Sequence, residues 1–524
     1  MRTVGGQFAK NNNQKYKMNN IDLSKVLRFI EENIRISEQT TIEYLDPKGH
    51  IERLNSKQNQ VVFGRRGSGK SLLLKSLKST DLETKLYITI NIEDFKDISF
   101  PNSISQVLIN VIKKFKKEID GKYNIFSYNQ WKKQKALIKK IDNYISDLNT
   151  KISEPDTYNQ NIKEKQASKL SGEASTCFDK SSAKISSELA DEYENSREIL
   201  KDKLNELKNE ISNFKELIEE TTLFLNKDIF LIFDDFYFIR KHEQPYFIDF
   251  FHRISKNTRL YLKIATIKHR TSLYIQTDTY VGVEIGHDIQ SLSLDYTLDD
   301  FNGLVSFMKS LLEHINNKVG VNIDYDDILT ENAFRFLCLA SGGVPRDFLS
   351  LFINLGSKMQ NGVRNVSKPN VIDCSIENLP NKMEAFKTDT AEEKSVLEHY
   401  LEFVKEEIIN QKRINAYLVS NNDVLKFPKI NQAVKELVDL RLFHLVNPNI
   451  SSAPSDGKRY SAYMIDISLF PNANPRNFTQ IEPGQKDERS REDKLRSSPK
   501  LNLDKFNNFI ESLNLTRDIT LTNE

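Results

Sequence analysis

One stretch constrains the fold of this chain more than any other: FGRRGSGKSLLL, which begins at Phe63. It holds the spacing Gly64-x-x-x-x-Gly69-Lys70-Ser71, with an apolar run on either side. Glycines allow positive φ and let backbone N–H groups converge on an anion, and a following helix directs the positive end of its dipole at the same point. The stretch therefore predicts a strand, a phosphate-binding loop and a helix in succession, the Walker A pattern of P-loop proteins.

Each residue type in this loop has a chemical role. In loops of this pattern the lysine reaches the β- and γ-phosphates, and the serine hydroxyl ligates Mg²⁺. We therefore expect ATP and Mg²⁺ as ligands, with Lys70 on the phosphates and Ser71 on the metal. The residues expected to line the nucleotide here are Gly64, Arg65, Arg66, Gly67, Ser68, Gly69, Lys70, Ser71 and Leu72.

A carboxylate site is predicted by DIFLIFDDF, residues 228–236, a continuous apolar run that ends in two aspartates. Open α/β sheets place their chemistry at the carboxyl ends of strands, so both side chains are expected beside the phosphate loop. Asp234 would hold Mg²⁺ through water, and Asp235 would polarise the attacking water as a general base. A turn or helix cap uses such residues too, but the loop upstream favours the Walker B role.

A further segment, KIATIKHR, contains the end of a strand predicted at 259–267 and offers a polar sensor of the γ-phosphate. Its candidates are Thr266, Lys268, His269 and Arg270, and no single one is decisive. Arg270 could sense its own nucleotide, reach that of a neighbouring copy, or form a surface salt bridge.

The segment SGGVPRDFL, residues 341–349, contains two glycines and a proline that break the chain and start a helix. Arg346 falls in the first turn of that helix, where a cation is unfavourable unless an anion is near. A nucleotide phosphate would supply the anion. A plain helix start with an exposed arginine is the alternative.

These four segments, in this order, resemble those of the AAA+ ATPases, and within them the origin-recognition and replication-initiator branch, as a bacterial or phage relative. The resemblance runs from about residue 40 to about residue 470. It implies an α/β P-loop sheet, a helical lid with a sensor arginine, and a carboxyl-terminal winged helix. The GGVP motif also resembles the STAND class of signalling ATPases, in which a lid and a winged helix follow the P-loop domain.

The chain departs from the replication initiators in two places. Residues 128–222 show two apolar seams at heptad-like spacing around a serine-rich stretch, which predicts an inserted coiled-coil hairpin. Residues 280–290, YVGVEIGHDIQ, hold no arginine where AAA+ proteins often place their arginine finger, so Arg270 would have to substitute.

The predicted layout has five parts, in an α/β fold with a parallel sheet covered on both faces. They are a disordered segment at 1–20, a P-loop core at 21–295 that includes the hairpin, a helical lid at 296–385, a winged-helix domain at 390–472, and a flexible tail with a short amphipathic helix at 473–524.

The winged-helix prediction rests on LEHYLEFVKEEII as a first helix, PKINQAVKELVDLRL as a recognition helix that starts at Pro428, and two wing strands. Basic residues on or near that helix and the wing tip would contact DNA phosphates. Docking of a protein is the alternative, because Glu436 and Asp439 dilute the charge. The DNA-binding candidates are Lys426, Lys429, Lys435, Lys458 and Arg459.

Composition sets limits on partners. The net charge of +2, from 75 basic and 73 acidic residues, argues against a strongly basic nucleic-acid coat but allows a local basic patch. Three dispersed cysteines form neither a disulfide framework nor a zinc spacing, and no apolar run is long enough for a signal or a membrane span. We expect a cytoplasmic protein without a membrane partner.

Together these features predict an ATP-binding and ATP-hydrolysing protein that acts as a switch or motor on double-stranded DNA. The alternative is a STAND-like ATPase, as in anti-phage defence, whose nucleotide state controls oligomerisation and a separate effector protein. Either reading predicts a homo-oligomer. A nucleotide-binding module without turnover is disfavoured by the paired acids Asp234 and Asp235.

Overall fold

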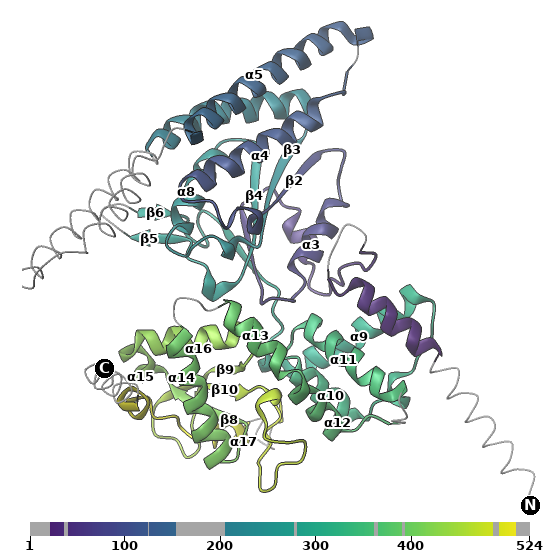
Figure 1. The fold of residues 1–524 in the computed structure, drawn as a ribbon, viewed down its shortest axis with the longest axis vertical. Coiled ribbons are helices and arrows are strands. Elements are labelled where there is room, and N and C mark those ends of the chain that lie inside the picture. Colours follow the sequence, from purple (N-terminus) through teal and green to yellow (C-terminus); the bar gives the residue numbers. More distant parts are fainter. Residues whose placement is uncertain are drawn as a thin grey trace, which may run out of the picture.

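The computed structural model describes residues 21–35, 40–123, 125–153, 205–276, 280–360, 365–389, 394–485 and 492–509. Figure 1 shows a sheet-containing upper part, an arm of long helices above it, and a lower part of helices with a small sheet. The segment predicted to be disordered, 1–20, and the serine-rich centre of the predicted hairpin, 154–204, lie outside the described residues.

The upper part is built on a parallel sheet with the strand order β2-β3-β4-β1-β7. Its strands are β1 (Gln60–Phe63), β2 (Lys85–Asn91), β3 (Asp228–Asp234), β4 (Leu260–Thr266) and β7 (Gln290–Ser293). The prediction of an α/β fold with a parallel sheet is confirmed. A two-stranded hairpin that was not predicted, β5 (Tyr274–Gln276) with β6 (Tyr280–Gly282), lies beside it.

The central strands of this sheet are buried on both faces, and successive residues of each strand point to opposite sides. Val61 and Ile264 belong to a core shared with α4 (Asn102–Ile119) and α8 (Gln244–Ser255). Val62 and Ala265 belong to a second core, which includes leucines of α2 (His50–Leu54) and α3 (Lys70–Lys78). This alternation explains why the strands read as continuous apolar runs in the sequence.

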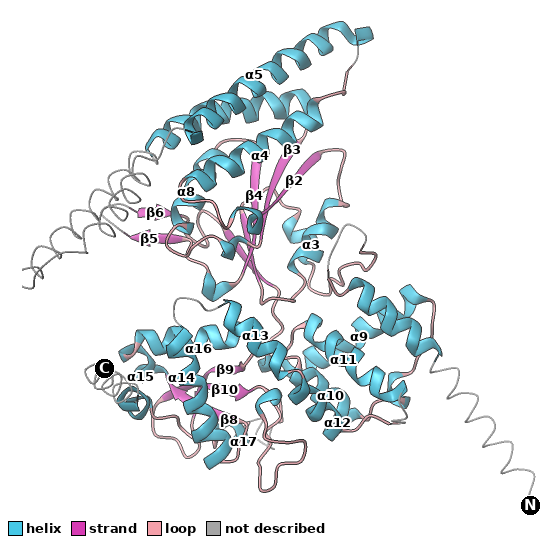
Figure 2. Cartoon of the chain, in the orientation of Figure 1, coloured by secondary structure: helices cyan, strands magenta, loops and turns pink. Residues whose placement is uncertain are grey.

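The arm consists of α5 (Tyr128–Ser153) and a helix over residues 205–225 (Figure 2). Leucine, isoleucine and phenylalanine side chains of the two helices share the core that also holds α4. Lys140 of α5 forms ion pairs of 2.8 Å with both Glu216 and Glu220 across the contact. The ends of the predicted hairpin are therefore paired helices.

The lower part begins with helices that follow the sheet in the sequence. They are α9 (Phe301–Val319), α10 (Glu331–Ala340), α11 (Pro345–Gln360), α12 (Lys368–Glu377) and α13 (Leu379–Asp389). Among the described helices none combines the length and apolarity needed to span a membrane. Cys338 and Cys374 are buried here as free thiols.

The structure places residues 21–33 differently from the prediction, which assigned them to the P-loop core. Their helix packs in the core of the lower part, together with α9 and α11. Leu27 lies so close to α11 that a Cβ added at Gly356 would approach its side chain to 2.6 Å. The apolar face of this helix finds its partners about 280 residues later, which local periodicity does not reveal.

The carboxyl-terminal elements form an antiparallel sheet of order β8-β10-β9 with helices beside it. They are α14 (Lys394–Val404), which continues as a π-helical turn (Lys405–Gln411), β8 (Ala416–Ser420), α15 (Asn421–Lys426), α16 (Pro428–Asp439), β9 (Phe443–Ser451) and β10 (Arg459–Ile465). The prediction named α14, α16 and the β9–β10 hairpin, and missed β8 and α15.

The described parts of the segment predicted as a flexible tail are packed, which corrects that prediction. The backbone N–H of Leu418 in β8 donates to Pro499, and that of Leu501 donates back to Leu418, both at 2.8 Å. Leu503 and Phe506 are buried in the core of the lower part. Burial of these few apolar side chains stabilises the packed segment, although most of its residues are polar.

Candidate functional site

The phosphate-loop candidate joins β1 to α3 at the carboxyl edge of the sheet. Gly67 and Gly69 have φ values of 89° and 96°, a conformation that favours glycine. Gly64 has no positive φ, and space is what requires glycine there: an added Cβ would lie 2.3 Å from Ser68 Oγ. Ser68 Oγ is itself buried without a hydrogen-bond partner among the described residues, which fits a loop built to receive an anion.

Lys70 is the first residue of α3 and its side chain lies under the loop. Its Nζ donates to the carbonyl oxygens of Gly64 at 2.8 Å and Arg65 at 3.2 Å. Burial lowers the pKa of Lys70, and the carboxylates of Asp235, Asp295 and Asp234 oppose that shift. The ammonium is thus held at the loop within the field of three acids.

The two acids end β3 as the sequence predicts, and they differ from each other. Asp235 has φ 53° and its backbone N–H donates to Asp234 Oδ1 at 3.0 Å. Burial and the neighbouring Asp234 raise the pKa of Asp235 to about 6, while Lys70 opposes the rise. A carboxylate whose pKa lies near neutrality can accept a proton at working pH.

Arg346 is brought to the same loop by the start of α11. Its backbone N–H donates to the carbonyl of Gly67 at 3.3 Å, and a Cβ added at Gly67 would lie 2.8 Å from Arg346 Cβ. Burial and the nearby Arg66 lower the pKa of Arg346, and Asp235 is among the acids that oppose this. Gly342 and Gly343, both with positive φ, form the turn that delivers the helix.

The sensor candidates divide into one residue beside the loop and three beyond it. Thr266 is buried at the end of β4; its carbonyl accepts from the backbone N–H of Gly64 at 3.1 Å, and its hydroxyl lies 2.6 Å from that of Thr271. Lys268 is exposed on the short 3₁₀ turn η4 (Lys268–Arg270). Burial, with Lys435 next in importance, lowers the pKa of His269 to about 4, so this ring is neutral at pH 7.

Arg270, the remaining candidate, lies over the ring of Tyr237 with 5.7 Å between the guanidinium carbon and the ring centroid. Tyr237 belongs to the 3₁₀ turn (Phe236–Phe238) directly after the paired acids. The arginine therefore contacts the segment that follows β3.

Sequence reasoning missed residues on two sides of the loop. Asp295, just after β7, accepts a hydrogen bond from the backbone N–H of Arg65 at 2.9 Å. The guanidinium of Arg65 donates to the carbonyl of Tyr296 at 3.0 Å. The ring of Tyr44 would lie 3.4 Å from a Cβ added at Gly69. Asp295 had a detectable signal, an acid that directly follows the alternating segment SLSL, residues 291–294. Tyr44 had none, since it sits in an irregular segment.

Helix α16, predicted to contact DNA, packs against the turn η4 that holds three of the sensor candidates. Gln432 donates to the carbonyl of His269 at 3.4 Å. Burial and the carboxylate of Asp295 raise the pKa of Asp439, at the other end of the helix, to about 7. Arg441, just after α16, forms a 2.5 Å ion pair with Asp347, the neighbour of Arg346.

The DNA-binding candidates are not all on one surface. Lys435 is partly buried and acts electrostatically on His269. Lys426 is exposed and paired with Asp423 at 2.9 Å, and Lys458 also acts on that carboxylate. Arg459 is exposed at the start of β10. The side chain of Lys429 lies outside the described part of the chain.

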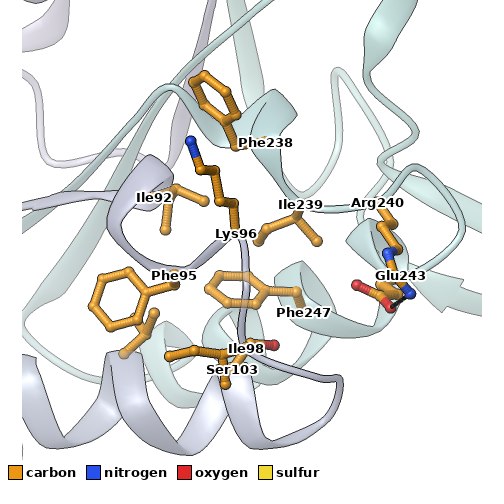
Figure 3. A pocket seen from close by; sticks show the side chains of 11 residues that line it. Ile92, Phe95, Lys96, Ile98, Ser103, Phe238, Ile239, Arg240, Glu243 and Phe247 are labelled. Atoms are coloured by element: carbon orange, nitrogen blue, oxygen red, sulfur yellow. Dashed lines mark ion pairs between the residues drawn. The ribbon is translucent and has the colours of Figure 1, made fainter. Parts of the chain in front are cut away.

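A small cavity lies next to the site but is too small for a nucleotide (Figure 3). It has a volume of about 20 Å³, room for a single water. Phe95 and Phe247 line it, and Lys96 lies 5.8 Å from the centroid of the Phe238 ring. The cavity lies beside the turn Phe236–Phe238, which follows the paired acids.

Comparison with known proteins adds little to this geometry. No family model and no curated protein matches the chain. Among solved structures it is similar to the Aeropyrum pernix ORC1 protein in complex with DNA, at 10% sequence identity and a TM-score of 0.30, over 82% of this chain and 93% of that one. A TM-score this low carries no argument about the site, so its interpretation depends on the residues described above.

Proposed function

We propose that this chain binds and hydrolyses ATP at the loop between β1 and α3 and uses the nucleotide state as a switch, in the manner of AAA+ proteins. One observation carries the proposal: the loop, the paired acids after β3, Thr266 of β4 and Arg346 of α11 converge at one edge of the sheet. Four segments far apart in the sequence bring two cations, two carboxylates and a threonine to the same loop.

The roles of the residues follow from their positions. Lys70 and Arg346 would bind the phosphates, and Asp235 would accept the proton of the attacking water. Mg²⁺, held by Ser71 and Asp234, would neutralise charge on the β- and γ-phosphates. Backbone N–H groups of the loop supply further donors, and α3 directs its amino terminus at the same point.

The lower part would act as the moving part of the switch. We assign α9 to α13 to a lid, and α14 to β10 to a winged-helix domain in which α16 is the recognition helix. Lys426, Lys458 and Arg459 would then contact double-stranded DNA, with Lys435 joining them once α16 leaves η4. A homo-oligomer, with Arg270 reaching the nucleotide of a neighbouring copy, belongs to the same proposal.

A second function is favoured by the packing of α16 on the nucleotide site. The Asp347–Arg441 pair and the contact of Gln432 with η4 join the carboxyl-terminal elements to the lid and to the sensor turn. Such contacts suit a STAND-like switch that signals to a separate effector protein. In that case α16 stays packed on η4 until the nucleotide is exchanged, and DNA takes no part in the switch.

The test is ATP turnover of the wild type and of Lys70→Ala, with and without double-stranded DNA, at two salt concentrations. Lys412→Ala, an exposed lysine on the lower part, is the matched control. Turnover that Lys70→Ala abolishes supports the ATPase assignment, and wild-type turnover in that variant would overturn it. Salt-sensitive stimulation by DNA supports the DNA-directed switch, whereas indifference to DNA favours the effector-directed one.

A further inference from the structure

The arm carries a concentration of charge that the proposed ATPase does not use. Residues 111–140, from the second half of α4 to the middle of α5, contain ten lysines and only two acids, Glu118 and Asp120, a net charge of +8. The whole chain has a net charge of +2, so the remainder is net acidic. A potential of this sign at one place attracts polyanions.

The lysines of this region divide into an inner and an outer set. On the inner side Lys116 pairs with Asp142 at 2.6 Å, and Lys140 pairs with Glu216 and Glu220. On the outer side Lys132, Lys135 and Lys139 are exposed, and no carboxylate of the described residues lies within ion-pair distance of them. The outer lysines keep their charge available for a partner.

Two aromatic rings share the outer face of α5 with these lysines. At 100° per residue, Tyr128, Trp131, Lys132, Lys135 and Lys139 fall within one arc of about 100°, and we call these five residues the arm stripe. Tyr128 is 59% exposed, and its ring stacks on that of Trp131 with 6.2 Å between centroids.

The composition of the arm stripe distinguishes among anionic partners. A helix that lies on a membrane separates an apolar face from a cationic one. Here the apolar face of α5, including Leu137 and Ile141, is buried in the protein core, and the two rings at the start of α5 are followed on one face by the three lysines. Aromatic rings for stacking on bases, combined with cations for phosphates, are the features of surfaces that bind single strands.

We propose that the arm stripe binds single-stranded nucleic acid. This site is separate from the nucleotide loop and from α16, since α5 forms the far edge of the upper part in Figure 1. Phosphates would lie along Lys132, Lys135 and Lys139, and bases would stack on Tyr128 and Trp131. The proposal does not depend on ATP hydrolysis.

Trp131 is the single tryptophan of the chain, so its fluorescence reports on the arm stripe directly in the full-length protein. Titration with a single-stranded oligonucleotide should quench this fluorescence, with an affinity that falls as salt rises. A duplex of the same length, heparin, and vesicles of phosphatidylserine and phosphatidylcholine are the comparison ligands. Equal quenching by duplex or by heparin would overturn the single-strand assignment. A blue shift with vesicles and no response to the oligonucleotide would replace it with a membrane contact.

Charge reversal tests the same site independently. The triple variant Lys132→Glu, Lys135→Glu, Lys139→Glu should weaken oligonucleotide binding by about tenfold or more, because three phosphate contacts become repulsive. A control variant with the same change in net charge is Lys256→Glu, Lys405→Glu, Lys412→Glu, which replaces exposed lysines outside the arm. Equal losses in the two variants would sink the proposal.

ATP turnover and far-UV circular dichroism establish that both triple variants are folded. A further outcome is that labelled duplex DNA binds the protein while the fluorescence of Trp131 stays unchanged. Such a result would indicate a duplex site outside the arm stripe, as the proposed function expects of the carboxyl-terminal elements. Failure of the arm proposal and failure of the proposed function therefore give different results.

Discussion

Lys263 and Lys70 are both buried in the sheet-containing part, and their surroundings differ. Lys263, in the middle of β4, donates to the carbonyl oxygens of Ser56 and Gln58 and to the side-chain oxygen of Gln60. Lys70 donates to two loop carbonyls and lies in the field of three carboxylates. The first lies beneath the amino-terminal end of β1, and the second lies beyond its carboxyl-terminal end.

The difference teaches how a structural lysine and a binding lysine can be told apart. An ammonium group has three donors. Lys263 has three fixed protein oxygens within hydrogen-bond distance, and burial, with Lys85 nearby, lowers its pKa to about 6. Lys70 has the charge of nearby acids to keep it protonated and protein acceptors for only two of its donors. Replacing each lysine should therefore affect different properties of the protein.

The largest expected effect is on turnover. Lys70→Ala should lower ATP turnover by about 10²-fold or more, the usual cost of removing a donor to developing charge, with a small change in the free energy of unfolding. Lys263→Met should leave turnover within about threefold of the wild type, since Lys263 contacts residues at the other end of β1 from the loop. Steady-state turnover and urea unfolding of both variants measure this. Equal losses of activity would remove the distinction between the two lysines.

The second effect concerns the acid that faces Lys70. Asp235→Asn should retain nucleotide binding and lower turnover by about 10²-fold or more. Because the pKa of Asp235 is about 6, the reactive carboxylate is present above that pH and is lost as pH falls through it. Wild-type turnover should therefore be about tenfold lower at pH 5 than at pH 8. A profile that stays level down to pH 5, with binding unchanged, would contradict the role of general base.

The third effect is on stability and belongs to Lys263. Its pKa is about 6 in the folded protein and about 10.4 in an unfolded chain. Between these values the unfolded state binds the extra proton, so the free energy of unfolding should rise with pH. The rise from pH 7 to pH 9 should be about 1 to 3 kcal/mol larger in the wild type than in Lys263→Met. Parallel curves from denaturant unfolding would show that Lys263 stays charged.

The smallest effect extends the comparison to α11. A double-mutant cycle on Asp347→Ala and Arg441→Ala should give a coupling energy of about 1 kcal/mol, because the pair is nearly buried and joins α11 to the carboxyl-terminal elements. Hydrogen exchange of α16 should quicken in either single variant. Additive variants with unchanged exchange would mean that the pair does not hold the two parts together.

Much of the sheet and the loop could be predicted because their signals are local. The continuous apolar runs that became β3 and β4 and the spacing from Gly64 to Ser71 each lie within about a dozen residues. The paired acids followed from the rule that parallel strands present their carboxyl ends at one edge.

The missed features depend on distant contacts. β8 is a five-residue strand that is fully buried only because β10 and the segment around Pro499 cover it. The tail looked flexible because its apolar residues are sparse, yet Phe506 is fully buried. Asp295 joined the site through Arg65, 230 positions earlier. Periodicity reads one segment at a time and contains no information about such pairs.

The helix at residues 21–33 has a consequence for how the chain is made. Its apolar side chains, among them Leu23, Val26 and Ile30, are buried against a core whose other members begin at Leu298. At synthesis rates of about 5 to 20 residues per second, this helix leaves the ribosome roughly 15 to 60 s before those partners exist. During that interval the apolar face of the helix is exposed to chaperones and to other nascent chains. The yield of folded protein should therefore depend on what binds that face during translation.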